Sequence, residues 1–99
     1  MVILKVRELK SWREKIVGLI GKKKPESVFI RTRFGIHTFF LKFPIDVMIL
    51  DSKNKVVDSK TIKPNRTFFW NPIYDKVLEL PEGTIEEKKI KNGNEIKIT

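Results

Sequence analysis

The run of residues 37–51, HTFFLKFPIDVMILD, is the most apolar part of the sequence and constrains the fold most strongly. Phe, Ile, Val and Thr are frequent in both halves of the run, and Pro44 divides them. Proline cannot donate a hydrogen bond to a sheet, and it forces the residue before it into an extended or turn conformation. We therefore predict two strands, at residues 37–43 and 45–51, joined by a turn.

Pairing these two strands as a simple hairpin determines which side chains share a face. Residue 41 then lies opposite residue 46, residue 39 opposite 48 and residue 37 opposite 50, and directly opposed residues share a face. The first face holds His37, Phe39, Leu41, Asp46, Met48 and Leu50. Because both faces are apolar, other parts of the chain must cover both of them, and we predict that the hairpin lies in the middle of the domain.

The rest of the chain predicts short strands and one helix. Residues 12–20 carry apolar side chains at helical spacing, and Ser11 and Glu14 have the capping-box arrangement. Residues 84–87 repeat that arrangement after Gly83 and predict a short helical turn. Strands are expected at residues 2–9, 27–33, 56–62, 74–80 and 95–98. This order predicts a mostly β fold, a β-sandwich or partly open barrel that is mainly antiparallel, with one α-helix in its N-terminal half.

Length and composition indicate a single compact domain spanning residues 1–99. The chain is 40% hydrophobic, as is usual for a folded globular protein. It has no cysteine, which excludes disulfides and fits a cytoplasmic protein. We expect no membrane partner, because no apolar stretch approaches roughly 20 residues and the start, MVILKV, lacks the order of a signal peptide. Abundant Lys and Glu, with neither Cys nor Gln, suggest a thermophilic source.

The net charge of +9 is concentrated in the first half of the chain. Residues 1–45 hold 11 basic and three acidic residues, whereas residues 46–99 hold 10 basic and nine acidic residues. A basic half can mark a surface that binds nucleic acid or another polyanion. The candidate residues for this surface are Lys22, Lys23, Lys24, Arg31 and Arg33. The alternative is a lysine-rich surface that is simply solvated.

Four stretches of the sequence resemble the domain-of-unknown-function 192 family of bacteria and archaea. They are GLI at residues 18–20, HTFFL at 37–41, FPIDV at 43–47 with the strand that follows, and VLELPEG at 77–83. The chain departs from the family pattern at Lys15, Ile20 and Asn94, where Arg, Met and Asp are usual, and at residues 37–38, where many members have Phe-Trp. The resemblance implies a compact β-rich domain and no particular activity.

The residues present exclude several kinds of chemistry. A structural zinc site needs about four Cys or His ligands, and the sequence has one histidine and no cysteine. In the predicted hairpin, His37 and Asp46 lie roughly 13 Å apart along the strands and do not form a catalytic dyad. The glycines are scattered and form no phosphate-binding loop. We identify no catalytic residue, cofactor or metal site, and whether the protein is an enzyme stays open.

Two classes of function remain. The first is a small-ligand module, with carbohydrate as one possible ligand, that uses the face of His37 and Asp46. Its candidate residues are His37, Thr38, Phe39, Asp46, Met48 and Trp70. The second is weak binding of nucleic acid or polyanion by the basic half. Asp46 also has a structural interpretation, because a buried carboxylate must accept hydrogen bonds, and we expect donors at the Pro44 turn.

Overall fold

The structure is a computed structural model that describes residues 1–9, 27–33, 35–39 and 41–99. The predicted helix at residues 12–20 lies outside the described residues, as do Lys22, Lys23 and Lys24. Strands are the main regular structure of the described residues, and the short helical turn predicted after Gly83 is present as α2 (Thr84–Glu87). Within these residues, no helix has the length and apolar character needed to cross a membrane.

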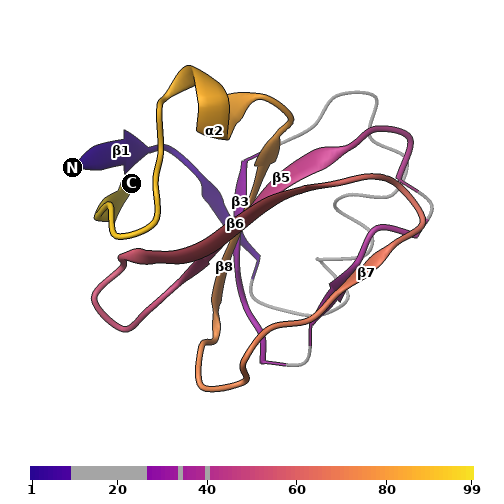
Figure 1. Cartoon of the computed structure of the whole chain (residues 1–99), viewed down its shortest axis with the longest axis horizontal. Coiled ribbons are helices and arrows are strands. Elements are labelled where there is room, and N and C mark those ends of the chain that lie inside the picture. Colours follow the sequence, from indigo (N-terminus) through magenta and orange to yellow (C-terminus); the bar gives the residue numbers. More distant parts are fainter. Residues whose placement is uncertain (10–26, 34, 40) are drawn as a thin grey trace.

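A five-stranded sheet forms the centre of the structure (Figure 1). In spatial order its strands are β2 (Arg7–Leu9), β3 (Val28–Arg31), β8 (Lys76–Pro81), β5 (Ile45–Leu50) and β6 (Val56–Ile62). β2 and β3 run parallel, whereas the other neighbours pair antiparallel. Among the described strands, β2 and β6 lie at opposite ends of this order, so the sheet is open rather than a closed barrel.

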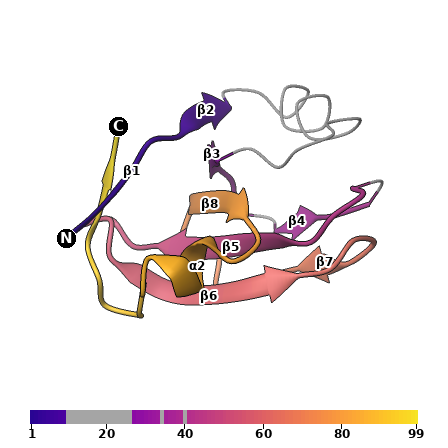
Figure 2. The ribbon, with the colours of Figure 1, turned by 90° about the horizontal axis from the view of Figure 1, so that it is seen from above.

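Two small strand pairs cover the faces of the central sheet. β1 (Val2–Leu4) and β9 (Ile96–Ile98) pair in parallel on one side, and both ends of the chain lie there together (Figures 1 and 2). The helical turn α2 lies on this side as well. β4 (Ile36–His37) and β7 (Thr67–Phe68) pair antiparallel on the other side. The predicted mostly β fold is therefore confirmed, but its sheets are mixed.

Strand β5 is the most buried element, and every one of its six residues is buried. Its side chains alternate between two apolar clusters, because successive residues of a strand point to opposite faces. Ile45, Val47 and Ile49 belong to the cluster on the β4–β7 side. Met48 and Leu50 belong to the cluster on the β1–β9 side. The predicted central position of this segment is confirmed.

The predicted hairpin between residues 37–43 and 45–51 is wrong. β5 pairs with β6 on one edge and β8 on the other, whereas β4 pairs with β7. The chain leaves β4 at Thr38 and turns back, with the Leu41 N–H donating to the Thr38 carbonyl oxygen. Leu41 therefore packs in the cluster on the β4–β7 side, whereas Asp46 points to the β1–β9 side. Phe39 is 42% exposed and is not part of the buried core.

The other predicted strands lie close to observed ones. The bounds of β6 match the prediction at residues 56–62, and β3, β8 and β9 differ from their predictions by a few residues. The predicted strand at residues 2–9 is divided into β1 and β2. The reason is that β1 pairs with β9 whereas β2 pairs with β3, so the two halves belong to different sheets.

Candidate functional site

Asp46 is buried in the middle of the structure, with 1% of its surface exposed. β5 places it opposite Thr61 of β6 and Leu80 of β8. Its Oδ1 accepts a hydrogen bond from the Thr61 hydroxyl at 2.7 Å, and its Oδ2 accepts one from the Ile85 backbone N–H at 3.0 Å. The predicted burial and hydrogen bonding are confirmed, but the donors come from β6 and α2 rather than from the turn at Pro44.

The bond to Ile85 caps the first turn of α2 from a distant strand. The N-cap residue is Gly83, which has no side chain and a φ of 90°. The Thr84 hydroxyl donates to the Pro81 carbonyl oxygen at 2.6 Å, so the predicted capping box does not form. The first N–H groups of a helix need acceptors from outside it. Asp46 supplies one of them and holds α2 against the sheet.

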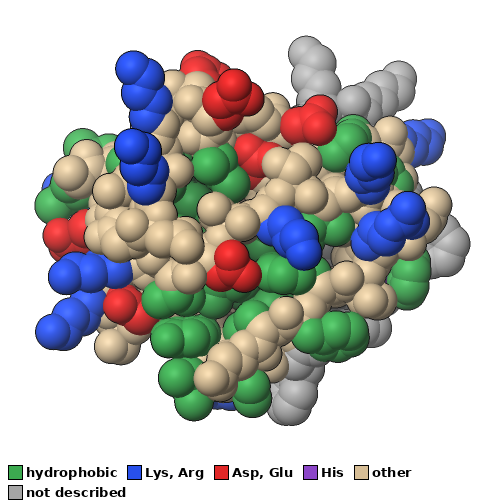
Figure 3. Space-filling view, viewed as in Figure 1, with side chains coloured by type: hydrophobic (Ala, Val, Ile, Leu, Met, Phe, Trp, Pro, Cys, Tyr) green, Lys and Arg blue, Asp and Glu red, His purple; other side chains and the backbone are tan. Residues whose placement is uncertain are grey.

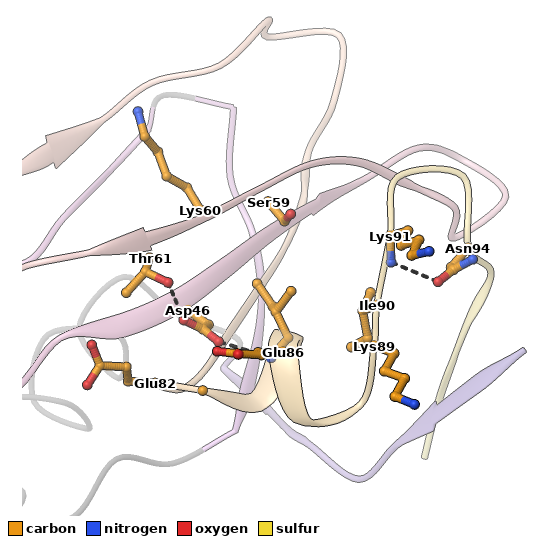
Figure 4. A pocket seen from close by; sticks show the side chains of 12 residues that line it. Asp46, Ser59, Lys60, Thr61, Glu82, Glu86, Lys89, Ile90, Lys91 and Asn94 are labelled. Carbon is orange, nitrogen blue, oxygen red and sulfur yellow. Dashed lines mark hydrogen bonds between the residues drawn. The ribbon is translucent and has the colours of Figure 1, made fainter.

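A polar groove of about 850 Å³ lies between α2, β6 and the segment that follows α2 (Figure 4). Asp46 lies between Thr61 and the helical turn at the inner side of this groove. The other polar side chains that line it are Ser59, Lys60, Thr61, Glu82, Glu86, Lys89, Lys91 and Asn94. The apolar lining consists of Ile85 and Ile90. The groove therefore offers cations, carboxylates, hydroxyls and an amide within one space.

His37 and Phe39 contact each other but lie outside the lining of this groove. Their rings stack with centroids 5.0 Å apart and an interplanar angle of 22°. The Nδ1 atom of His37 is buried and has no hydrogen-bond partner among the described residues. His37 lies in β4, which pairs with β7, whereas Asp46 lies in β5 of the central sheet.

The other three predicted ligand-binding residues have structural surroundings. Thr38 is 1% exposed, and its hydroxyl donates to the Lys63 carbonyl oxygen at 2.7 Å. Met48 is fully buried in the apolar cluster of the β1–β9 side. Trp70 is partly buried, and its Nε1 donates to the Tyr74 carbonyl oxygen at 2.8 Å. Among the six residues predicted to bind a ligand, Asp46 lines the groove and the other five do not.

The two described residues of the predicted basic surface make contacts within the protein. The Arg33 guanidinium donates to the Pro72 carbonyl oxygen at 2.7 Å and lies 3.8 Å from the Asp75 carboxylate. The Arg31 guanidinium carbon lies 5.4 Å from the centre of the Phe29 ring. The structure therefore shows internal partners for both arginines.

A second buried carboxylate, Glu79, lies on the opposite face of the central sheet. It is 1% exposed, and β8 places it opposite Val47, whereas Asp46 lies opposite Leu80. Because neighbouring residues of a strand point to opposite faces, Asp46 and Glu79 do not form a carboxylate pair for acid–base chemistry. Within the described residues, no group of three or more His, Cys, Asp or Glu could hold a metal ion.

Sequence reasoning missed the groove residues of β6 and of the segment after α2. Ser59 and Thr61 of β6 point to the face of Asp46, and their spacing of two residues within a predicted strand was the signal that could have placed them on one side. Lys89, Lys91 and Asn94 carry no local signal of this kind, because they join the groove through the path of the chain after α2.

The fold and the site together define a small mixed-sheet β protein with a polar groove beside a buried aspartate. The family model DUF192, described as an uncharacterized ACR, matches residues 3–98. The chain therefore belongs to the DUF192 family, as its sequence motifs indicate. The family description assigns no molecular function.

Similar proteins occur in archaea. A UPF0127 protein of Pyrococcus horikoshii is 37% identical over 98 residues, which cover 93% of this chain and 85% of the relative. A UPF0127 protein of Thermococcus kodakarensis is 36% identical over 69 residues, which cover 70% of this chain and 44% of the relative. The match to a UPF0127 protein of Pyrococcus abyssi is 37% identical and covers 66% of this chain and 57% of the relative. The genera of these relatives agree with the thermophilic composition.

The chain spans less than two thirds of the Thermococcus kodakarensis and Pyrococcus abyssi relatives that it matches. No solved structure matches the chain significantly.

Proposed function

We propose that the protein binds a small polar ligand in the groove between α2 and β6. The observation that carries this proposal is the groove itself, whose volume of about 850 Å³ lies within the range of known ligand pockets. Ligand pockets place a few polar groups around a concave space to orient the molecule they bind. Here the polar groups come from three parts of the chain that are far apart in sequence.

The lining favours a ligand with several hydroxyl groups, a class that includes carbohydrates. The Ser59 hydroxyl can donate and accept, whereas the Thr61 hydroxyl offers only an acceptor because it already donates to Asp46. Lys89 and Lys91 donate, and Glu86 accepts. A polyhydroxylated molecule presents donors and acceptors together and can use this mixture. No aromatic side chain lines the groove among the described residues, so recognition would depend on hydrogen bonds rather than on ring stacking.

The role of Asp46 in this proposal is to position the groove wall. Its carboxylate is buried and already accepts bonds from Thr61 and Ile85, so it holds β6 and α2 at a fixed separation. The groups that contact the ligand are then the exposed ones on the groove sides, chiefly Lys89 and Lys91.

A titration followed by amide chemical shifts tests the proposal. Monosaccharides and linear polyols at millimolar concentration should shift the amides of residues 59–61 and 82–94 in a saturable way. The variant Lys89→Ala/Lys91→Ala should weaken this binding by about tenfold, because it removes two charged donors. The control variant Lys5→Ala/Lys97→Ala removes the same charge from exposed positions outside the groove and should bind normally. If no compound shifts these amides, the proposal is wrong.

The alternative, polyanion binding by the basic N-terminal half, has less support from the described residues. Arg33 already donates to the Pro72 carbonyl oxygen and pairs with Asp75. Arg31 lies against the Phe29 ring. These contacts favour the small-ligand proposal over a function of the predicted basic surface.

A further inference from the structure

A small basic hollow lies at the connection between β6 and β7, apart from the groove beside Asp46. It has a volume of about 280 Å³, and its charged lining consists of Lys60, Lys63 and Arg66. No acidic side chain lines it in the part of the chain that the structure describes. Figure 3 shows several basic side chains on the right-hand part of this face, where Figure 1 places the β6–β7 connection, and others towards its left-hand edge. The charge at this hollow is therefore of one sign.

The hollow and the groove lie on opposite faces of β6. Thr61 shares the face of Asp46, to which it donates a hydrogen bond. Lys60, the preceding residue, points to the other face, where its Nζ lies 5.7 Å from the centre of the Phe68 ring. Lys60 and Thr61 contribute to the lining of both spaces, whereas Lys63 and Arg66 line the hollow but not the groove.

Buried Thr38 holds the loop that carries two of the three cations. Its hydroxyl donates to the Lys63 carbonyl oxygen at 2.7 Å and accepts from the Arg66 N–H at 2.9 Å. Its backbone N–H donates to the Arg66 carbonyl oxygen at 2.8 Å, and its carbonyl oxygen accepts from the Asn65 N–H at 2.9 Å. These bonds fix both ends of the loop, so the backbone positions of Lys63 and Arg66 are set before any ligand arrives.

The third cation is also restrained by its surroundings. The Lys60 ammonium faces the Phe68 ring, an arrangement in which the ring attracts the cation. Phe68 in turn contacts Trp70, with ring centroids 5.7 Å apart, and packs against the apolar cluster of this side. The ring is therefore fixed in the fold and limits the positions that the Lys60 side chain adopts.

We propose that this hollow binds a phosphate group. Three cations around a small hollow attract a dianion or a chain of phosphodiesters, and the guanidinium of Arg66 matches two phosphate oxygens at once. The Thr67 hydroxyl, also in the lining, adds a further donor. Because the loop is held in advance by Thr38, binding costs less ordering of the protein. The phosphate belongs either to a small phosphorylated molecule or to a single-stranded nucleic acid.

The test uses three probes at low ionic strength: inorganic phosphate, a nucleoside monophosphate and a short single-stranded oligonucleotide. We expect saturable shifts of the backbone amides at residue 63 and at residues 65–68. The variant Lys63→Ala/Arg66→Ala should weaken the binding of every probe that binds by about tenfold or more, since it removes two charged donors. The control Lys5→Ala/Lys97→Ala lowers the net charge by the same amount at exposed positions outside the hollow and should change affinity less than about twofold.

The comparison of probes identifies the source of the phosphate. Binding of inorganic phosphate or the monophosphate at least as tightly as the oligonucleotide supports a small phosphorylated ligand. Tighter binding of the oligonucleotide, with affinity that falls steeply as salt rises, supports a nucleic-acid backbone. The proposal is overturned if no probe binds wild-type protein, or if the control variant loses as much affinity as the loop variant, because the effect would then follow net charge alone. Neither outcome bears on the groove beside Asp46, whose test uses uncharged ligands.

Discussion

The side chain of Asp46 joins three elements of the fold: β5, β6 and α2. It lies in a strand whose six residues are all buried, and each of its two carboxylate oxygens accepts one hydrogen bond. A buried carboxylate without donors is costly, so the positions of Thr61 and the α2 backbone are coupled to its presence. The sequence predicted this burial, because Asp46 lies in a strand with apolar residues on both faces.

Replacing Asp46 should therefore lower the stability of the fold. We expect Asp46→Ala to reduce the free energy of unfolding by about 1–3 kcal/mol, since it leaves the Ile85 N–H and the Thr61 hydroxyl without their acceptor. Urea denaturation measures the change. The control Glu95→Ala removes an exposed carboxylate and should stay within about 0.5 kcal/mol of wild type. An unchanged midpoint for Asp46→Ala would mean that the carboxylate does not fix α2.

Asp51 gives a prediction about pH. The Lys55 N–H donates to its Oδ1 at 2.9 Å and the Lys53 N–H does so at 2.8 Å, and these bonds hold the pKa of Asp51 below its ordinary value of 3.8. Because the folded-state pKa is the lower one, the stabilisation is fully present above the unfolded-state pKa. It is lost as pH falls through the folded-state pKa.

An NMR titration of the side-chain carboxyl carbon of Asp51 should give a midpoint below 3.8. The variant Asp51→Asn should lose the corresponding pH dependence, so the difference in melting temperature between wild type and variant should shrink from about pH 5 to about pH 2. A midpoint at or above the ordinary value would show that the turn at residues 51–55 does not bind the carboxylate in solution.

The path of the chain after β4 depends on Thr38. A β-branched residue in an apolar run is typical of a strand, and the sequence predicted that residues 37–43 continue as one. In the structure the Thr38 backbone and hydroxyl bind the loop between β6 and β7 instead of extending a ladder to β5. The partner of Thr38 lies in a loop more than 20 residues further along the chain. The local sequence pattern around Thr38 therefore could not show that it binds this loop instead of continuing a strand.

The variant Thr38→Val tests this role with a nearly unchanged side-chain shape. It removes the donor to Lys63 and the acceptor for the Arg66 N–H, and we expect a loss of about 1–2 kcal/mol in unfolding free energy. Amide hydrogen exchange should become faster at residues 65 and 66 than in the β5–β8 ladder. Thr38→Ser keeps the hydroxyl and should protect the loop better than valine does. Equal exchange in both variants would contradict the assigned role of the hydroxyl.

Across the fold, the sequence predicted the positions of strands better than it predicted which strands pair with each other. β6, β8, β9 and α2 follow from local alternation, turn residues and helix spacing, and each lies near its predicted place. The pairings of β5 with β8 and of β1 with β9 join segments that local pattern does not connect. The groove depends on such pairings, since its lining spans residues 46–94. Asp46 could be predicted as buried, whereas its neighbours in the groove could not be predicted.

The parallel pairing of β1 with β9 brings residues near the two ends of the chain into one core. Leu4 and Ile96 are both buried in the cluster that also contains Met48 and Leu78 of the central sheet. Packing of this kind couples the end strands to the central sheet. A change in β9 should then lower the stability of the whole fold instead of only loosening one end.

We expect Ile96→Ala to lower the free energy of unfolding by about 2–5 kcal/mol, because it leaves a cavity in the apolar cluster to which Leu4 and Met48 also belong. The matched control on the same strand is Lys97→Ala, which removes an exposed side chain and should lower the free energy of unfolding by less than about 0.5 kcal/mol.

Amide hydrogen exchange shows whether the variant destabilises the whole fold or only the end strands. If the strands unfold as one unit, Ile96→Ala should accelerate exchange of the β5 amides at residues 47–49 by the factor that corresponds to the loss of stability measured in urea. If the β5 amides keep their wild-type exchange rates while those of β1 and β9 become faster, the end strands open independently of the central sheet, and the coupling inferred from the shared core is wrong.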